Sequence, residues 1–155
     1  MGAITSPVKR YPGTVTLPES LSLPACVAYE EARQAVAPQL CPEAFRIRNK
    51  LAEAEEGKRE AVLVELQEHL STCFDSDKKP RCKPAVVGAA ADKACVPAIL
   101  ACVSEWKLDG VPAKPTAATF PGSPRADSAA LVAWLMKEIE ALYVGEGLDE
   151  PDPNA

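Results

Sequence analysis

The strongest helical pattern in the chain is Ser128-Ala-Ala-Leu-Val-Ala-Trp-Leu-Met-Lys-Glu-Ile-Glu-Ala-Leu-Tyr143. Its large apolar residues recur at steps of 3, 1, 4 and 3, the spacing of one helix face, at Leu131, Trp134, Leu135, Ile139 and Leu142. Met136 and Tyr143 widen this stripe, so we expect two faces of the helix to contact protein. Ser123 or Asp127 is the predicted N-terminal cap.

A second apolar helix precedes this one. The spacing of the apolar residues predicts a helix from Cys95 to Trp106, with Pro97 in its first turn. The prolines between Val111 and Pro124 then exclude helix and favour an extended connector. We expect this connector to pack on the protein through Phe120.

The middle of the chain predicts further helices. A short helix from Pro24 to Pro38 is followed by a helical region from Pro42 to Leu70. Within that region, residues 50–60 are predicted to form a solvated face, helped by a Glu55–Arg59 pair one helical turn apart. Regular spacing is lost between Ser71 and Asp92, which predicts a loop.

The N-terminal residues predict an extended arm. Prolines flank the β-prone run Thr14-Val-Thr-Leu17, and proline cannot donate to a sheet ladder, so the arm can contribute an edge strand or a hairpin. The patterns together predict a mainly α fold, a small bundle of four to five helices. We expect an N-terminal arm (1–23), a helical domain (24–145) and an acidic flexible tail (146–155).

Composition and charge exclude several classes of partner. The 155 residues are 47% hydrophobic but 5% aromatic, which fits one domain with a thin, helical core. The formal net charge of -5 does not attract phosphate backbones, so we expect no nucleic-acid partner. No apolar run approaches the ~18 residues that span a bilayer, and the first residues lack signal-peptide zones. We therefore expect no membrane contact and a cytosolic protein.

The six cysteines do not predict a disulfide framework. Three disulfides are typical of small secreted domains, and the chain shows no signal peptide that would indicate secretion. Cys95 and Cys102 lie seven residues apart on one predicted helix face. Reduced cysteine behaves there as a small apolar residue, so we expect both to be buried free thiols.

Candidate chemistry is limited by a single histidine. His69 could join Cys73, Cys82 and one further thiol in a zinc site, but this spacing matches no tight paired-ligand motif. A His69–Cys73 nucleophile pair lacks a recognisable electropositive pocket. Asp75 and Asp77 lack the glycine and the closing glutamate of a calcium loop, and no phosphate-binding loop occurs. We predict no catalytic residues, no metal and no cofactor.

Aromatic residues are better candidates for partner binding. Large aromatic side chains bury much area and dominate interaction hot spots. On this ground alone we predict partner contacts at Tyr11, Trp106, Phe120, Trp134 and Tyr143. Either tryptophan could equally serve a homo-oligomer interface.

The layout of the chain resembles a viral family. An arm, Thr5-Ser-Pro-Val-Lys-Arg-Tyr-Pro-Gly-Thr-Val-Thr-Leu17, precedes a helical middle, then Trp106-Lys-Leu-Asp-Gly110, Phe120-Pro-Gly-Ser-Pro-Arg125 and a closing helix with Leu131-Val-Ala-Trp-Leu-Met-Lys-Glu-Ile139. This order is similar to small tail-assembly proteins of long-tailed bacteriophages, of the tail assembly chaperone type. The cysteine-bearing stretch from Cys73 to Cys95 lies outside the resemblance.

The resemblance implies a small helical protein without catalytic residues. It would bind the long helical tape measure protein and help tail tube subunits polymerise around it, in the host cell cytoplasm. Two alternatives remain open from the sequence. One is a structural virion protein of the tail or connector that locks neighbouring subunits, and the other is a small thiol- or zinc-dependent protein built on the histidine and cysteines.

Overall fold

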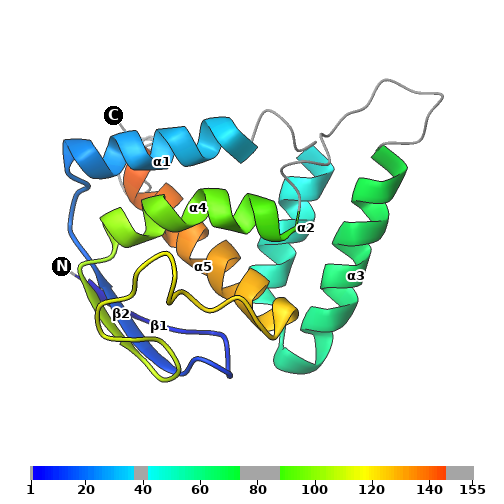
Figure 1. Ribbon diagram of the computed structural model, residues 1–155. Coiled ribbons are helices and arrows are strands. Elements are labelled where there is room, and N and C mark those ends of the chain that lie inside the picture. Colours follow the sequence, from blue (N-terminus) through cyan, green and yellow to red (C-terminus); the bar gives the residue numbers. More distant parts are fainter. Residues whose placement is uncertain (1, 37–41, 74–87, 146–155) are drawn as a thin grey trace, which may run out of the picture.

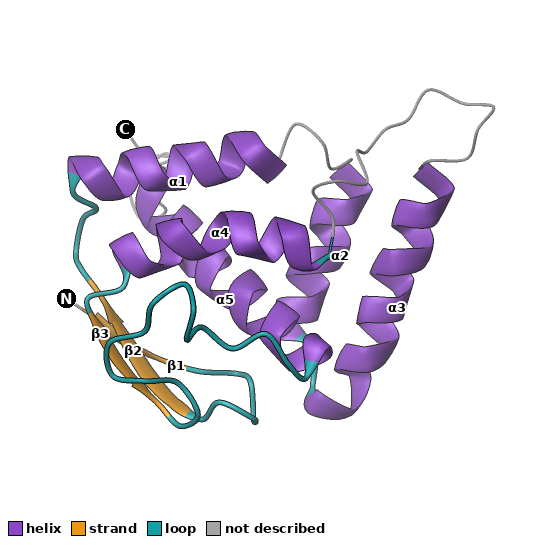
Figure 2. Ribbon diagram, viewed as in Figure 1, coloured by secondary structure: helices purple, strands orange, loops and turns teal. Residues whose placement is uncertain are grey.

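The computed structural model describes residues 2–36, 42–73 and 88–145 (Figure 1, Figure 2). Within these ranges the chain forms five helices and three strands: β1 (Gly2–Thr5), β2 (Gly13–Leu17), α1 (Leu23–Val36), α2 (Pro42–Glu53), α3 (Glu56–Cys73), α4 (Ala89–Cys102), β3 (Glu105–Leu108) and α5 (Arg125–Val144). The mainly α fold predicted from the sequence is confirmed, with a small sheet added to it.

Helix α5 is the central element, in contact with α2, α3 and α4 (Figure 1). Residues 128–135 are all buried, and Ile139 follows one turn later. Eight consecutive buried residues span more than two helical turns, so protein surrounds this part of the helix on every side. The expectation that two faces of α5 contact protein is therefore confirmed.

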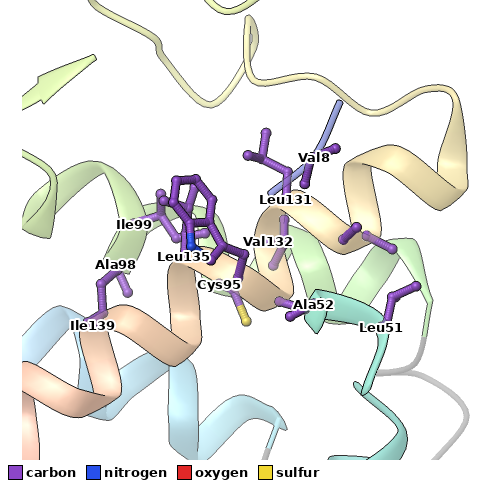
Figure 3. Close-up of a cluster of buried hydrophobic side chains, with 14 of the residues drawn as sticks. Val8, Leu51, Ala52, Cys95, Ala98, Ile99, Leu131, Val132, Leu135 and Ile139 are labelled. Atoms are coloured by element: carbon purple, nitrogen blue, oxygen red, sulfur yellow. The ribbon is translucent and has the colours of Figure 1, made fainter. Parts of the chain in front are cut away.

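The core around α5 draws on most of the fold. Figure 3 shows Leu135 and Ile139 of α5 close to Ile99 of α4, with Leu51 of α2 and Val8 from the loop between β1 and β2 in the same cluster. All five side chains are at most 1% exposed. Burial of one such side chain stabilises the folded state by about 1.5–3 kcal/mol.

The three strands form an antiparallel sheet with β2 in the middle. Val15 is paired with Ile4 of β1 and with Trp106 of β3, and its side chain is buried. Gly13 has φ 128°, and a Cβ atom there would lie 2.0 Å from the carbonyl oxygen of Lys107. Only glycine permits this approach of β2 to β3. The strand expected within the arm is confirmed, and it belongs to a sheet that includes a distant segment.

The predicted helix from Cys95 to Trp106 is wrong at its C-terminal end. Helix α4 stops at Cys102, Val103 is extended with φ -81° and ψ 123°, and Trp106 lies in β3. The backbone N–H and the hydroxyl of Ser104 both donate to the Thr16 carbonyl, at 2.9 and 2.8 Å. These bonds to β2 replace the helical bonds that local spacing predicts. The prediction fails because local spacing carries no information about the distant strand.

The start of α4 also differs from the prediction. The helix begins at Ala89, inside the stretch for which we predict a loop, and Pro97 lies within the helix rather than in its first turn. Proline has no N–H, so the carbonyl of Lys93 lacks the donor that an α-helix normally supplies one turn later. The alanines at 89–91 compensate through high helix propensity.

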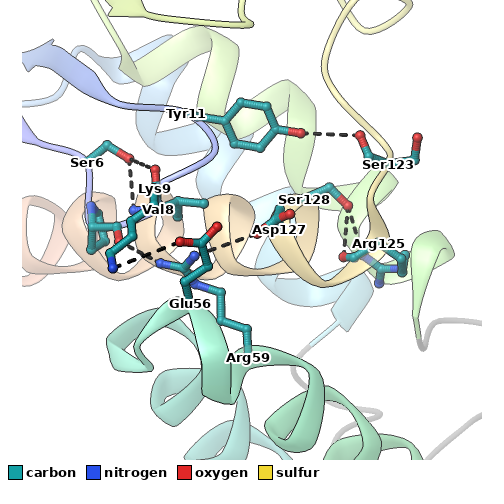
Figure 4. A network of polar contacts seen from close by, with 11 residues as sticks. Ser6, Val8, Lys9, Tyr11, Glu56, Arg59, Ser123, Arg125, Asp127 and Ser128 are labelled. Atoms are coloured by element: carbon teal, nitrogen blue, oxygen red, sulfur yellow. Dashed lines mark hydrogen bonds and ion pairs between the residues drawn. The ribbon is translucent and has the colours of Figure 1, made fainter.

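The predicted solvated face at residues 50–60 is wrong at Leu51 and Ala52, which are buried in the core, and at Arg59, which is 1% exposed. Its Nη2 donates to the Pro7 carbonyl at 2.5 Å, and its Nη1 lies 3.6 Å from Oδ1 of Asp127 (Figure 4). Arg59 therefore joins α3 to the arm and to α5, in place of the expected pair with Glu55. The helical region itself divides into α2 and α3 at residues 54–55.

The predicted side-chain cap of α5 is also wrong. The helix starts at Arg125 after Pro124, without a side-chain cap. Asp127 is the partner of Arg59, and Ser123 uses its carbonyl to accept a hydrogen bond from the Tyr11 hydroxyl at 3.4 Å. Both candidate cap residues thus hold the N-terminal end of α5 against other segments.

We predict that Asp127→Asn lowers the free energy of unfolding by about 2–3 kcal/mol, because it leaves the buried Arg59 guanidinium without its counter-charge. Adding Arg59→Met should restore part of this loss, because no buried charge then remains. Urea denaturation of both variants measures the effect. Asp109→Asn, at an exposed turn, is the matched control, and an Asp127→Asn loss no larger than this control would contradict the prediction.

Candidate functional site

The connector between β3 and α5 is held in a defined turn. The backbone N–H of Phe120 donates to the Thr116 carbonyl at 2.9 Å, and the N–H of Thr116 donates to Oγ1 of Thr119 at 2.8 Å. This turn brings the Phe120 ring edge-on to the Trp106 indole, with ring centroids 6.2 Å apart and an interplanar angle of 83°. Phe120 is half-buried, so part of the ring remains available to solvent.

The end of the connector is fixed from two sides. The Tyr11 hydroxyl donates to the Ser123 carbonyl, and the Ser128 hydroxyl lies 3.1 Å from the Gly122 carbonyl (Figure 4). Tyr11 is buried, and this burial raises the pKa of its hydroxyl, which therefore remains a donor at neutral pH. The connector is thus a rigid wall rather than a loose link.

A groove opens between this wall, the first half of α4 and the start of α5, with a cavity volume of about 310 Å³. We call it the Phe120 groove. Its apolar walls are formed by Val96, Pro97, Ala117, Phe120, Pro121 and Val132. Apolar walls of this kind bind apolar side chains or ligands.

Charged residues stand at one end of the Phe120 groove. Asp92 is buried on α4, with Oδ1 2.6 Å from Arg48 of α2 and Oδ2 2.5 Å from Nη1 of Arg125 of α5. The Arg125 contact is ionic, since Oδ2 accepts no aligned hydrogen bond. Lys93, next along α4, is exposed and lines the groove without an ion pair to a described residue. Two guanidinium groups thus share one carboxylate beside a further cation.

A second cavity lies between α1 and α2. Helix α1 packs mainly on α4, whereas α2 packs on α5, and the space left between them has a volume of about 300 Å³. Tyr29, Arg33, Cys95 and Met136 are among its lining residues. Burial raises the pKa of the Cys95 thiol to about 11, so the thiol stays neutral at physiological pH. A neutral thiol is a poor nucleophile, which argues against thiol chemistry in this cavity.

The five predicted contact residues lie in different environments. Tyr11, Trp106 and Trp134 are 3, 7 and 5% exposed, so they belong to the core and could touch a partner only if the core opened. Tyr143 is half-buried, with its ring 4.6 Å from Tyr29. Phe120 alone among the five lines the Phe120 groove.

The candidate metal and thiol residues are only partly described. His69 is half-buried on α3, whereas Cys82, Asp75 and Asp77 lie outside the described residues. Cys73 ends α3, but its side chain is not described. In the described ranges, no three His, Cys, Asp or Glu side chains gather as metal ligands. The expectation of buried free thiols at Cys95 and Cys102 is confirmed.

No local sequence pattern indicates that these charged residues meet. Arg48, Asp92 and Arg125 are separated by 44 and 33 residues, and Asp92 falls in a stretch predicted to be loop. Charged residues at such separations meet only through the packing of α2, α4 and α5. A helix prediction starting at residue 89 would have placed Asp92 and Lys93 on a helix, but not beside Arg125.

Comparison with other proteins does not assign a family: no protein-family model, curated protein or solved structure matches the chain. Among the described helices, none combines the length and apolar character needed to cross a membrane.

We predict that Cys95 and Cys102 resist iodoacetamide in the native protein and that Cys26, which is partly exposed, reacts before either of them. Burial raises the pKa of both protected thiols from the ordinary value of 9.0 to about 11. At a given pH this rise lowers the fraction of reactive thiolate about a hundredfold. Mass spectrometry of peptides after timed alkylation measures each rate. The same reaction in urea is the control, and equal native rates for Cys26 and Cys95 would contradict the burial argument.

Proposed function

We propose that this protein is a non-catalytic binding protein of phage tail assembly, which holds a segment of a partner protein in the Phe120 groove. The observation that carries the proposal is an open apolar groove with preformed walls next to the half-buried Phe120. Its partners would be the tape measure protein and the tail tube subunits in the host cell cytoplasm. That part of the proposal rests on the resemblance of the sequence.

The size of the groove supports binding of a protein segment. About 310 Å³ is near the lower end of the range of roughly 300–1,000 Å³ found for small-molecule pockets. It can hold one or two anchoring side chains, while the rest of the partner lies on the surface. An amphipathic helix with one large apolar side chain facing α4 and α5 fits this geometry.

The rigidity of the groove supports the same role. Trp106 stands behind Phe120, and the hydrogen bonds of Tyr11 and Ser128 fix the end of the connector. Association is penalised when loops must be ordered at the interface, so a preformed wall favours affinity.

The groove lacks the groups of a common catalytic site among its described lining residues. The Ser128 hydroxyl is hydrogen-bonded to the backbone carbonyls of Gly122 and Arg125, and no histidine lies beside it. Activation of a serine needs an adjacent general base. The polar groups of the groove are better suited to orienting a partner.

A structural virion protein is the second candidate. The order β1–β2–β3 leaves the outer edges of β1 and β3 without a strand partner in the described part of the chain. Such an edge can accept a strand from a neighbouring subunit. This observation favours a role in which copies of the protein, or tail subunits, are locked together.

We expect Ala117→Phe to weaken the retention of a co-expressed tape measure protein by about tenfold or more, because the added ring fills the groove from its exposed rim. Affinity-tagged protein co-expressed with a phage tape measure protein, the partner that the resemblance implies, provides the measurement. Ala113→Phe, on an exposed connector site outside the groove, is the matched control.

The two variants separate a groove effect from a folding effect. Both should keep the circular dichroism and melting temperature of the native protein. Binding that is equal in the two variants would argue against the groove as the docking site. Absence of any tape measure or tube protein from the native complex would argue against the proposed function itself.

The two candidate functions also differ in where the protein ends up. An assembly factor should leave the tail before maturation, whereas a structural protein remains. We expect mass spectrometry of purified virions to detect the tube and tape measure proteins without this chain. Detection of the chain at a stoichiometry similar to that of a tail component would favour the structural role.

A further inference from the structure

We infer that the Phe120 groove recognises an acidic segment of a partner protein, in which a carboxylate lies within one helical turn of an apolar anchor. The inference rests on the proposed function, because it assigns the chemistry of the segment that the groove holds. It is carried by positive charge at the groove that no described residue compensates.

The charge balance at the groove is positive. Arg48 and Arg125 contact the same carboxylate, that of Asp92, so one of the two positive charges has no negative partner there. Lys93 adds a second positive charge on the adjacent position of α4. Arg48 itself lines the second cavity, so the described charges that line the Phe120 groove are Lys93, Arg125 and Asp92, an excess of about one positive charge within a protein whose formal net charge is -5.

The excess charge is accessible from the groove. The side chain of Arg48 is 12% exposed, whereas that of Arg125 is 30% exposed, so solvent and a ligand reach the charge mainly at Arg125. Arg125 and Lys93 both line the groove, one from the start of α5 and the other from α4. A carboxylate at the mouth of the groove would therefore meet a cation from each helix.

The apolar walls increase the effect of these charges. Val96, Phe120 and Val132 line the groove with apolar groups, and a lower local dielectric beside them strengthens attraction between opposite charges. A basic segment would lose its hydration in the groove and would be repelled by the same two cations. Like-charge contact of this kind contributes to partner selection.

A helical partner sets the spacing between the apolar anchor and the carboxylate. Residues three or four positions apart lie on the same side of a helix, so an anchor in the groove places an acidic residue at that distance over its rim. Nucleic acid also carries negative charge, but it does not supply an aliphatic anchor for the apolar walls. A protein segment that is both apolar and acidic therefore fits the groove better than nucleic acid does.

An unbiased library of random helix-length peptides tests the inference. The full-length native protein and its Ala117→Phe, Lys93→Glu and Lys114→Glu variants are each used for selection. Lys114 is an exposed connector lysine outside the groove, so Lys114→Glu matches the charge change of Lys93→Glu. A single-stranded nucleic-acid pool is screened in parallel.

We expect peptides recovered by the native protein to carry Asp or Glu three or four residues from a large apolar residue. The affinity of such a peptide, measured by fluorescence anisotropy, should fall about fivefold with Lys93→Glu and stay within twofold with Lys114→Glu, since attraction of about half a kcal/mol becomes repulsion. Added salt should weaken native binding more than Lys93→Glu binding.

The outcomes distinguish this inference from the proposed function. Recovery of peptides that Ala117→Phe excludes, but without acidic enrichment, would overturn the inference and leave the docking groove intact. Failure to recover any peptide above the Ala117→Phe background would overturn both. Preferential recovery of nucleic acid that Lys93→Glu abolishes would overturn the inference that the groove binds a protein segment.

Discussion

Burial of residues 128–135 of α5 on every side is the constraint on which the other elements depend. A helix whose residues 128–135 are all buried must be enclosed by several neighbours at once. Helices α2, α3 and α4 supply much of this enclosure. The chain segment carrying Val8 completes it, which requires the N-terminal residues to fold back onto the helices (Figure 3). The hairpin, the sheet and the helices are thus parts of one core.

Three ion pairs, centred on the buried Arg59 and Asp92, hold the elements at the start of α5. Arg59 ties α3 to the arm and to Asp127, while Asp92 ties α4 to α2 and α5 through Arg48 and Arg125. Replacement of buried ion pairs by apolar residues is often neutral for stability, so the pairs themselves are weak evidence for added stability. Removal of one partner is costly because it leaves a buried charge unpaired.

The Phe120 groove is a consequence of the same arrangement. Pairing of β3 with β2 fixes where the connector begins, and the contacts of Tyr11 and Ser128 fix where it ends. The connector therefore runs beside α4 without filling the space next to Phe120. The Asp92 contact that joins three helices also brings Arg125 to that space. A packing contact and a candidate recognition site thus share the same side chains.

Local sequence was sufficient for α5, the β-prone run in β2 and the buried thiols, because apolar spacing and residue type act over a few positions. Tertiary structure determined the rest. Trp106 entered a strand because β2 was available to pair with it. Arg59 became buried because Pro7 and Asp127 supplied partners far away in the sequence. The groove charges likewise meet only after packing, since no local pattern relates residues so widely separated.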